Sequence, residues 1–216
     1  MEGNGFTGFN PAVAKSNIVA FAQESSEVVG DFEDAHYAFF ETLADFWASP
    51  KAVEFYEAYN TKILDLIDNM SAQFKAIVSG SVKAFNYASS ANGYSGTIDA
   101  GSIDVYSPVG DNLPALLDQK NGNVGMNISA IEENILPNYK IEINRIITSI
   151  SSLPKAIALY DDENGQQHAY QTHIDTVSDN VSSLISEMEK GLEQAIATET
   201  NNILLAKQQS TDTLAA

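Results

Sequence analysis

The strongest candidates for a metal-binding or catalytic site are Glu33 and His36. They form a Glu-x-x-His pair inside a stretch where apolar residues recur with the helical period. On a helix this spacing places a carboxylate and an imidazole on one face, as in the metal centres of di-iron four-helix bundles. Such a centre needs a second Glu-x-x-His and two further glutamates on facing helices, and the sequence has no second pair. We therefore expect no metal site, with His36 beside the Phe32 and Phe39 stripe and Glu33 in solvent.

Two other groups of potential ligands also fall short of a site. His168 and His173 are five positions apart, whereas two ligands on one helical face need a spacing of three or four. The acidic run from Asp161 to Gly165 lacks the alternate spacing of a calcium loop. The chain also has no Cys, no Gly-rich phosphate loop and no nucleophile elbow. The sequence thus predicts a non-enzymatic protein without catalytic residues, metal or cofactor.

Charge and hydropathy narrow the classes of partner. The chain carries 29 acidic and 11 basic residues, a formal charge of −18, which repels phosphates and anionic lipids. We therefore expect no nucleic-acid partner. No run of about 18 apolar residues exists, so we expect no stable membrane insertion. Residues 1–11 have neither the basic nor the apolar region of a signal peptide, and we expect none.

Four long helices are predicted from apolar residues that recur with the helical period. Asn10 and Ser49 are N-cap residue types, each followed by a proline at the first helical position, and they mark the first two starts. The third helix should start near Ser129 after an Asn127 cap, and Pro137 should kink or restart it. The fourth is expected from about residue 166 to residue 207, with a frayed tail at 208–216.

The segment between the second and third helices has a different character. Residues 89–123 are rich in Gly, Ser, Asn and Pro, which is typical of a connection. Within it, weak alternation from Thr97 to Tyr106 predicts a short strand pair, and residues 112–120 predict a helical turn. The second chain reversal is expected between Leu153 and Gly165.

The turn between the first two helices carries the most distinctive motif. It contains the only tryptophan of the chain, in the pattern Trp47, Ser49, Ala52 and Phe55. A shift of 104 positions aligns this turn and its proline with a second turn marked by Pro154, Ala156 and Leu159, although Ser151 replaces the tryptophan. Chance similarity between two amphipathic helix pairs would give the same picture. We favour an internal duplication, because the match includes the turn itself.

The motif resembles that of the WXG family, helical-hairpin proteins exported by type VII secretion systems. In that family Trp-x-Gly marks the tip between two long helices, and an Ala and a Phe follow at fixed spacing. Trp47, Ser49, Ala52 and Phe55 occupy those positions, with Ser49 in place of the glycine. The family's export signal is often Tyr-x-x-x-Asp/Glu after the second helix. Only Tyr37 with Glu41 fits that pattern here, and it lies within the first helix.

The periodicity and the resemblance together predict an all-α fold, an elongated antiparallel four-helix bundle made of two tandem hairpins. The hairpins are expected at 1–90 and 124–216, joined by a linker at 91–123. Such a chain is an internal pseudo-dimer, which we expect to be monomeric or to form a dimer whose halves are already paired.

The resemblance implies type VII export, secretion or surface display without a signal peptide, and contacts with the secretion machinery and a WXG-type or toxin partner. Trp47 is expected to fix the hairpin tip and to be partly exposed beside Phe46 for recognition. Two alternatives stay open: a targeting-type helical domain of a secreted toxin system, and an α-helical pore-forming toxin component.

Overall fold

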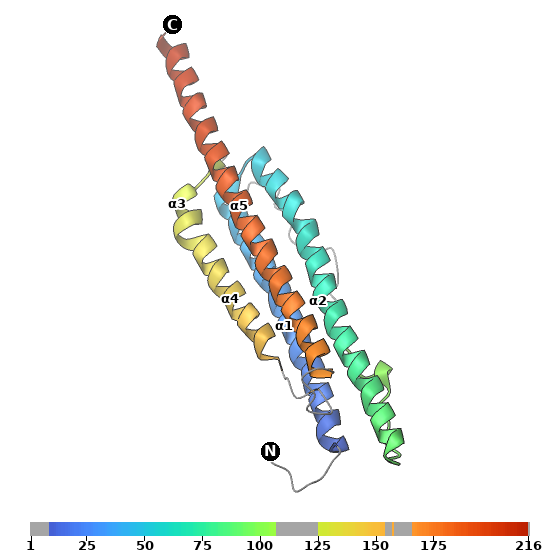
Figure 1. The fold of residues 1–216 in the computed structure, drawn as a ribbon. Helices are drawn as coiled ribbons and strands as arrows, with labels where there is room; N and C mark the ends of the chain where they lie inside the picture. Colours follow the sequence, from blue (N-terminus) through green and yellow to red (C-terminus); the bar gives the residue numbers. More distant parts are fainter. Residues whose placement is uncertain (1–8, 107–124, 154–156, 158–165, 216) are drawn as a thin grey trace. The chain divides into compact units, whose positions relative to one another are not determined.

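The computed structural model describes residues 9–106, 125–153, 157 and 166–215, and it is an all-α, antiparallel four-helix bundle (Figure 1). The first two long helices are α1 (Pro11–Phe46) and α2 (Pro50–Ala91). The third is a continuous helical segment of α3 (Ile128–Ala130), the π-helical turn η2 (Ile131–Ile135) and α4 (Leu136–Ser152). The fourth is α5 (Gln166–Ala215).

The N-cap residues start three of these helices as the sequence predicted. The side-chain oxygen of Asn10 accepts hydrogen bonds from two backbone N–H groups of the first turn of α1, at 3.0 and 3.2 Å. The Ser49 hydroxyl accepts one at 3.2 Å at the start of α2, and Asn127 accepts one at 3.1 Å at the start of α3. These bonds satisfy N–H groups that have no partner within the helix.

Pro137 is accommodated by a π-helical turn that precedes it. A proline has no N–H, and in an α-helix its ring clashes with the carbonyl four residues earlier. The backbone widens just before this position, so that the N–H of Leu136 donates to the carbonyl of Ile131, five residues back. The helix therefore continues through Pro137 instead of restarting.

Two local predictions were wrong. Residues 97–106 form no strand pair; Asp99 instead caps a short 3₁₀ helix, η1 (Ala100–Ser102), by accepting a bond from the N–H of Gly101 at 3.0 Å. The tail predicted to fray is helical, because α5 continues to Ala215. The predicted helical turn at 112–120 and most of the reversal at 153–165 lie outside the described residues.

The chain divides into two compact units, each of which takes segments from all four long helices. Unit 1 comprises Met1–Phe32, Leu66–Pro108 and Arg145–Asn180. Its core joins α1, α2 and α5 around Phe21, whose ring lies 6.0 Å from Phe74 and 5.4 Å from Tyr170, both edge-on. An ion pair of 2.9 Å between Arg145 and Asp31 links α4 to α1 at the surface of this unit.

Unit 2 comprises Glu33–Asp65, Val109–Asn144 and Val181–Ala216. Phe39 of α1 stacks on Tyr139 of α4 with ring centres 4.2 Å apart, and Phe40 meets Tyr56 of α2 edge-on at 5.2 Å. Both units contain parts of both predicted hairpins, so the compact units do not coincide with the hairpins. The division into hairpins at 1–90 and 124–216 stays a prediction.

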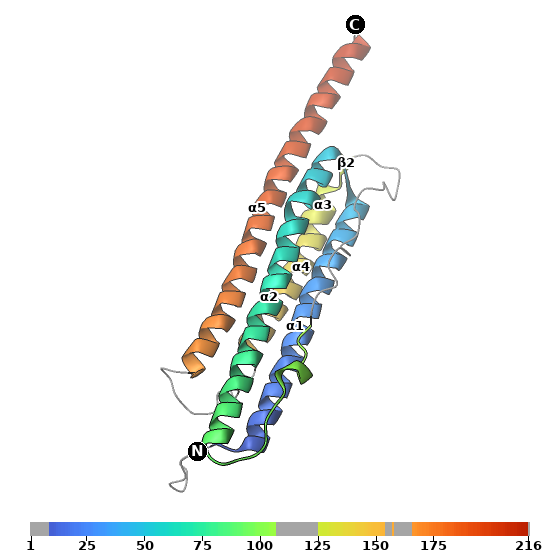
Figure 2. The ribbon, with the colours of Figure 1, turned by 90° about the vertical axis from the view of Figure 1, so that its right-hand side faces the viewer.

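The apolar stripes predicted from the sequence form the core of both units. Most large apolar side chains of the four long helices are buried, whereas Phe46 and Leu204 are 38% and 59% exposed. No helix in the described ranges combines the length and the apolar character that a membrane crossing requires. Figure 2 shows α1, α2 and α5 from a second direction, turned by 90° from Figure 1.

Candidate functional site

The turn between α1 and α2 is fixed to the start of the third helix by a short pair of strands. Strand β1 (Trp47–Ala48) pairs antiparallel with β2 (Gly125–Met126), with Trp47 opposite Met126. Next to this pair the N–H of Asn127 donates to the carbonyl of Phe46 at 2.8 Å. Gly125 has a φ of 124°, a conformation that favours glycine over any residue with a side chain. Backbone pairing therefore holds the turn against the start of the third helical segment.

A buried polar network connects this turn to α5. The indole N–H of Trp47 points at two acceptors, the Ser49 hydroxyl at 3.0 Å and a carboxylate oxygen of Glu199 at 3.2 Å. The Ser49 hydroxyl in turn donates to the same oxygen of Glu199. Glu199 is only 6% exposed, so its burial depends on these donors. Ser49 thus serves both as the cap of α2 and as the link to α5.

Apolar packing completes the cluster around Trp47. The indole is 2% exposed, and its ring centre lies 5.5 Å from that of Phe55, which lies 4.8 Å from that of Tyr59. Ala52 is buried one turn before Phe55. The four residues of the WXG-like pattern therefore come together in one place, in unit 2.

The expected exposure of Trp47 was wrong. Its indole is buried, with its ring close to that of Phe55 and its N–H directed at Ser49 and Glu199. The exposed aromatic ring at this turn is that of Phe46. The equivalent turn residues of the repeat, Pro154, Ala156 and Leu159, lie outside the described residues.

Sequence reasoning missed Glu199, although a signal for it exists. Leu192, Ala195 and Glu199 follow one another at spacings of three and four, and all three are buried. A glutamate that continues the apolar stripe of a helix needs a polar partner. The partner Ser49 is 150 residues away in the sequence. The pattern therefore indicates that Glu199 needs a polar partner but does not identify it.

A second buried polar contact lies between α1 and α4 in unit 2. His36 is fully buried, and its Nε2 atom lies 2.6 Å from the hydroxyl of Tyr139. Burial, with a smaller contribution from the charge of Glu189, raises the pKa of Tyr139 well above its usual value of 10.0. The neutral phenol is therefore the form in the core, held by His36.

The other potential ligands are dispersed. Glu33 is half-buried near His36, His168 is exposed, and His173 is hydrogen-bonded to Gln73 of α2. Among the residues that the structure describes, no three acidic or histidine side chains lie close enough together to hold a metal ion.

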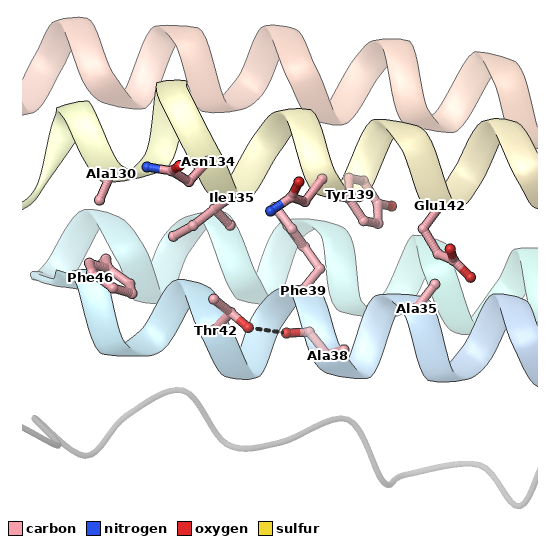
Figure 3. A pocket seen from close by; sticks show the side chains of 11 residues that line it. Ala35, Ala38, Phe39, Thr42, Phe46, Ala130, Asn134, Ile135, Tyr139 and Glu142 are labelled. Atoms are coloured by element: carbon pink, nitrogen blue, oxygen red, sulfur yellow. Dashed lines mark hydrogen bonds between the residues drawn. The ribbon is translucent and has the colours of Figure 1, made fainter.

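A groove of about 470 Å³ runs along unit 2 between α1 and the third helical segment (Figure 3). Small side chains open it on both sides, with Ala35 and Ala38 on α1 and Ala130 on α3. Phe39 and Tyr139 line its inner part, Phe46 lies at one end and Glu142 at the other (Figure 3). Its lining is mainly apolar, with Thr42, Asn134 and Asn138 as further polar members. Its length and lining suit an apolar helix face better than a polar substrate.

Comparisons with protein-family models, with curated proteins and with solved structures found no match for this chain.

Proposed function

We propose that this chain is a non-enzymatic protein exported by a type VII secretion system, acting through protein–protein contacts as a secreted substrate or a co-export partner. The observation that carries the proposal is the cluster of Trp47, Ser49, Ala52 and Phe55 at the turn between two long antiparallel helices. This is the place that the motif takes in the family that the sequence resembles.

The contacts of Ser49 account for the departure from glycine in the motif. A serine at this position caps α2, accepts the indole N–H of Trp47 and donates to Glu199. These are three hydrogen bonds that a glycine side chain cannot make. We infer that Ser49 stabilises the same turn by polar contacts.

Because Trp47 is buried, we assign positioning and recognition at the α1–α2 turn to two different residues. Trp47 positions the turn, and the exposed ring of Phe46 beside it is the surface that the secretion machinery would contact. The Tyr-x-x-x-Asp/Glu pattern occurs only at Tyr37 and Glu41, within α1.

The test is export from a strain with a working type VII system, compared with the same strain lacking the type VII ATPase. We expect the protein outside the cells of the first strain and inside those of the second. Export at an equal level from both strains would refute the proposal.

Two variants separate positioning from recognition. Trp47→Ala should lower the free energy of unfolding by about 3–5 kcal/mol and reduce export with it, because the indole is packed and hydrogen-bonded. Phe46→Ala should reduce export while the melting temperature stays close to that of the wild type. If Phe46→Ala is exported normally, recognition lies elsewhere on the molecule.

A further inference from the structure

The last part of α5 is left largely exposed by the other described residues of its own chain. From Thr200 to Ala215 every side chain is exposed except the half-buried Ile203, and both views show α5 continuing beyond the α1–α2 turn of unit 2 (Figures 1 and 2). Leu204, Leu205 and Leu214 are 59%, 59% and 89% exposed. A helix of this length, rich in Thr, Asn and Gln, is marginal in water without a surface to pack against.

We propose that this part of α5 docks into the groove between α1 and the third helical segment of a second copy of the chain. The inference does not rest on export, although Phe46, the recognition residue proposed above, also lines one end of the groove. We call residues 200–215 the tail, and the space between α1 and the third helical segment the groove.

The dimensions of the two surfaces agree. On the tail, Leu204, Lys207, Thr211 and Leu214 recur at spacings of three and four, so they share one face. Leu204 and Leu214 are separated by about 15 Å along the helix axis, and the α1 wall of the groove from Ala35 to Phe46 spans about 16 Å. Leucine side chains can fill the space that alanines leave on the walls of the groove.

The charges also favour a second copy as the occupant. The chain carries a formal charge of −18, so two copies repel each other over most of their surface. The tail is the exception, because Lys207 and Asp212 are its only charged side chains and they cancel. Lys207 lies on the same face as Leu204 and Leu214, and the groove carries Glu142 at one end. A tail without net charge is thus the part of this acidic chain that can approach another copy.

Because tail and groove are different surfaces of one chain, two copies either exchange tails reciprocally in a closed dimer or bind in one direction through head-to-tail contacts. Such contacts form rings where the rotation closes and open chains where it does not. A single helix in a groove is a small interface, so the association should be weak and should be sought at concentrations from about 10 µM to 1 mM.

The experiment measures the mass of the full chain by sedimentation equilibrium across that range. We expect the wild type to associate, and both Leu204→Glu on the tail and Ala38→Arg in the groove to raise the dissociation constant about tenfold or more. Leu205→Glu is the control for the tail, because Leu205 is equally exposed but lies about 100° away around the helix. Ala72→Arg is the control for the groove, at an exposed helical alanine outside it.

A mixing experiment decides which surfaces meet. Leu204→Glu keeps an intact groove and Ala38→Arg keeps an intact tail, so an equimolar mixture of the two should form a dimer that neither forms alone. Circular dichroism of each variant confirms that it is folded. A wild type that stays monomeric up to about 1 mM, or a groove variant that associates like the wild type because two tails pair with each other, would overturn the proposal.

Discussion

At the scale of single residues, Glu199 is the side chain whose environment depends most on distant parts of the chain. Its carboxylate is buried and receives hydrogen bonds from the Trp47 indole and the Ser49 hydroxyl. A buried polar group that loses its partners costs more than the bond itself contributes, so the three residues should behave as a unit.

Glu199→Ala should therefore lower the free energy of unfolding by about 1–3 kcal/mol, because it leaves the buried indole N–H and the half-buried Ser49 hydroxyl with fewer acceptors. Glu199→Gln should be milder, since an amide oxygen can still accept from both donors. Chemical denaturation measures the difference, with Glu193→Ala on the exposed face of α5 as the control. Trp47 is the only tryptophan, so its fluorescence reports on this site directly. Equal stability of the Ala and Gln variants would contradict the network.

Tyr139 gives a prediction for the dependence of stability on pH. Burial raises its pKa well above 10.0, and burial likewise raises the pKa of Tyr170 in unit 1. Above about pH 10 the unfolded chain releases phenolic protons that the folded chain retains, so the free energy of unfolding falls as the pH rises. Stability at neutral pH does not depend on this effect, because both states are protonated there.

Tyr139→Phe should make that alkaline loss shallower and should cost about 1–3 kcal/mol at pH 7, because Nε2 of buried His36 loses its partner. Urea unfolding midpoints between pH 7 and pH 11 test both effects. Tyr87→Phe is the control, at a tyrosine that is 80% exposed. A parallel pH profile in Tyr139→Phe would show that Tyr139 is not the titrating group.

At the scale of elements, α2 and α5 approach closely where Tyr59 meets Gly191. The Tyr59 hydroxyl donates to the carbonyl of Glu187 at 3.0 Å, and a Cβ atom on Gly191 would lie 2.8 Å from two carbons of the Tyr59 ring. The ion pair of Lys62 with Glu187 joins the same two helices. Gly191 is thus required by the packing of these helices and not by a turn.

Gly191→Ala should destabilise the protein by about 1–3 kcal/mol, because the tyrosine must move, although alanine is the better helix former. Gly30→Ala on α1 is the matched control. No atom lies within 4 Å of its added Cβ, so this change should raise stability by up to about 1 kcal/mol. Thermal unfolding of the two variants should therefore shift in opposite directions. A shift to higher temperature in both would show that Tyr59 can move without cost.

The elements also show what sequence alone can predict. Helix starts at Asn10, Ser49 and Asn127 were confirmed because a cap acts on N–H groups two or three residues away. The hydrogen bond between Trp47 and Glu199 was not predicted, because it joins residues 152 positions apart in the sequence. The strand pair expected at 97–106 was wrong, because Asp99 caps a 3₁₀ turn locally and such a turn competes with a strand.

At the scale of the whole molecule, each compact unit depends on both halves of the chain. Unit 1 and unit 2 both contain segments of α1 and α2 together with segments of α4 and α5. A single hairpin consequently lacks half of the helices that cover its apolar stripe, including the partners of Phe21 and Phe39.

Residues 1–92 expressed alone should for this reason self-associate or aggregate. Light scattering and the binding of a hydrophobic dye measure this, and the full chain at the same concentration is the control. Adding residues 124–216 as a second polypeptide should restore helix content and suppress dye binding. A monomeric fragment with a cooperative unfolding transition would show that a hairpin is stable without the other half.

The buried position of Glu199 has a consequence for the action of proteases. It is the last buried residue of α5, so local opening of the helix beyond it exposes no buried side chain. Lys190 lies before this border and Lys207 beyond it, so brief digestion with trypsin should cut α5 after Lys207 first. The nine residues removed would include Leu214, and the rate of this cut should fall as the protein is concentrated if tails are held by neighbouring copies.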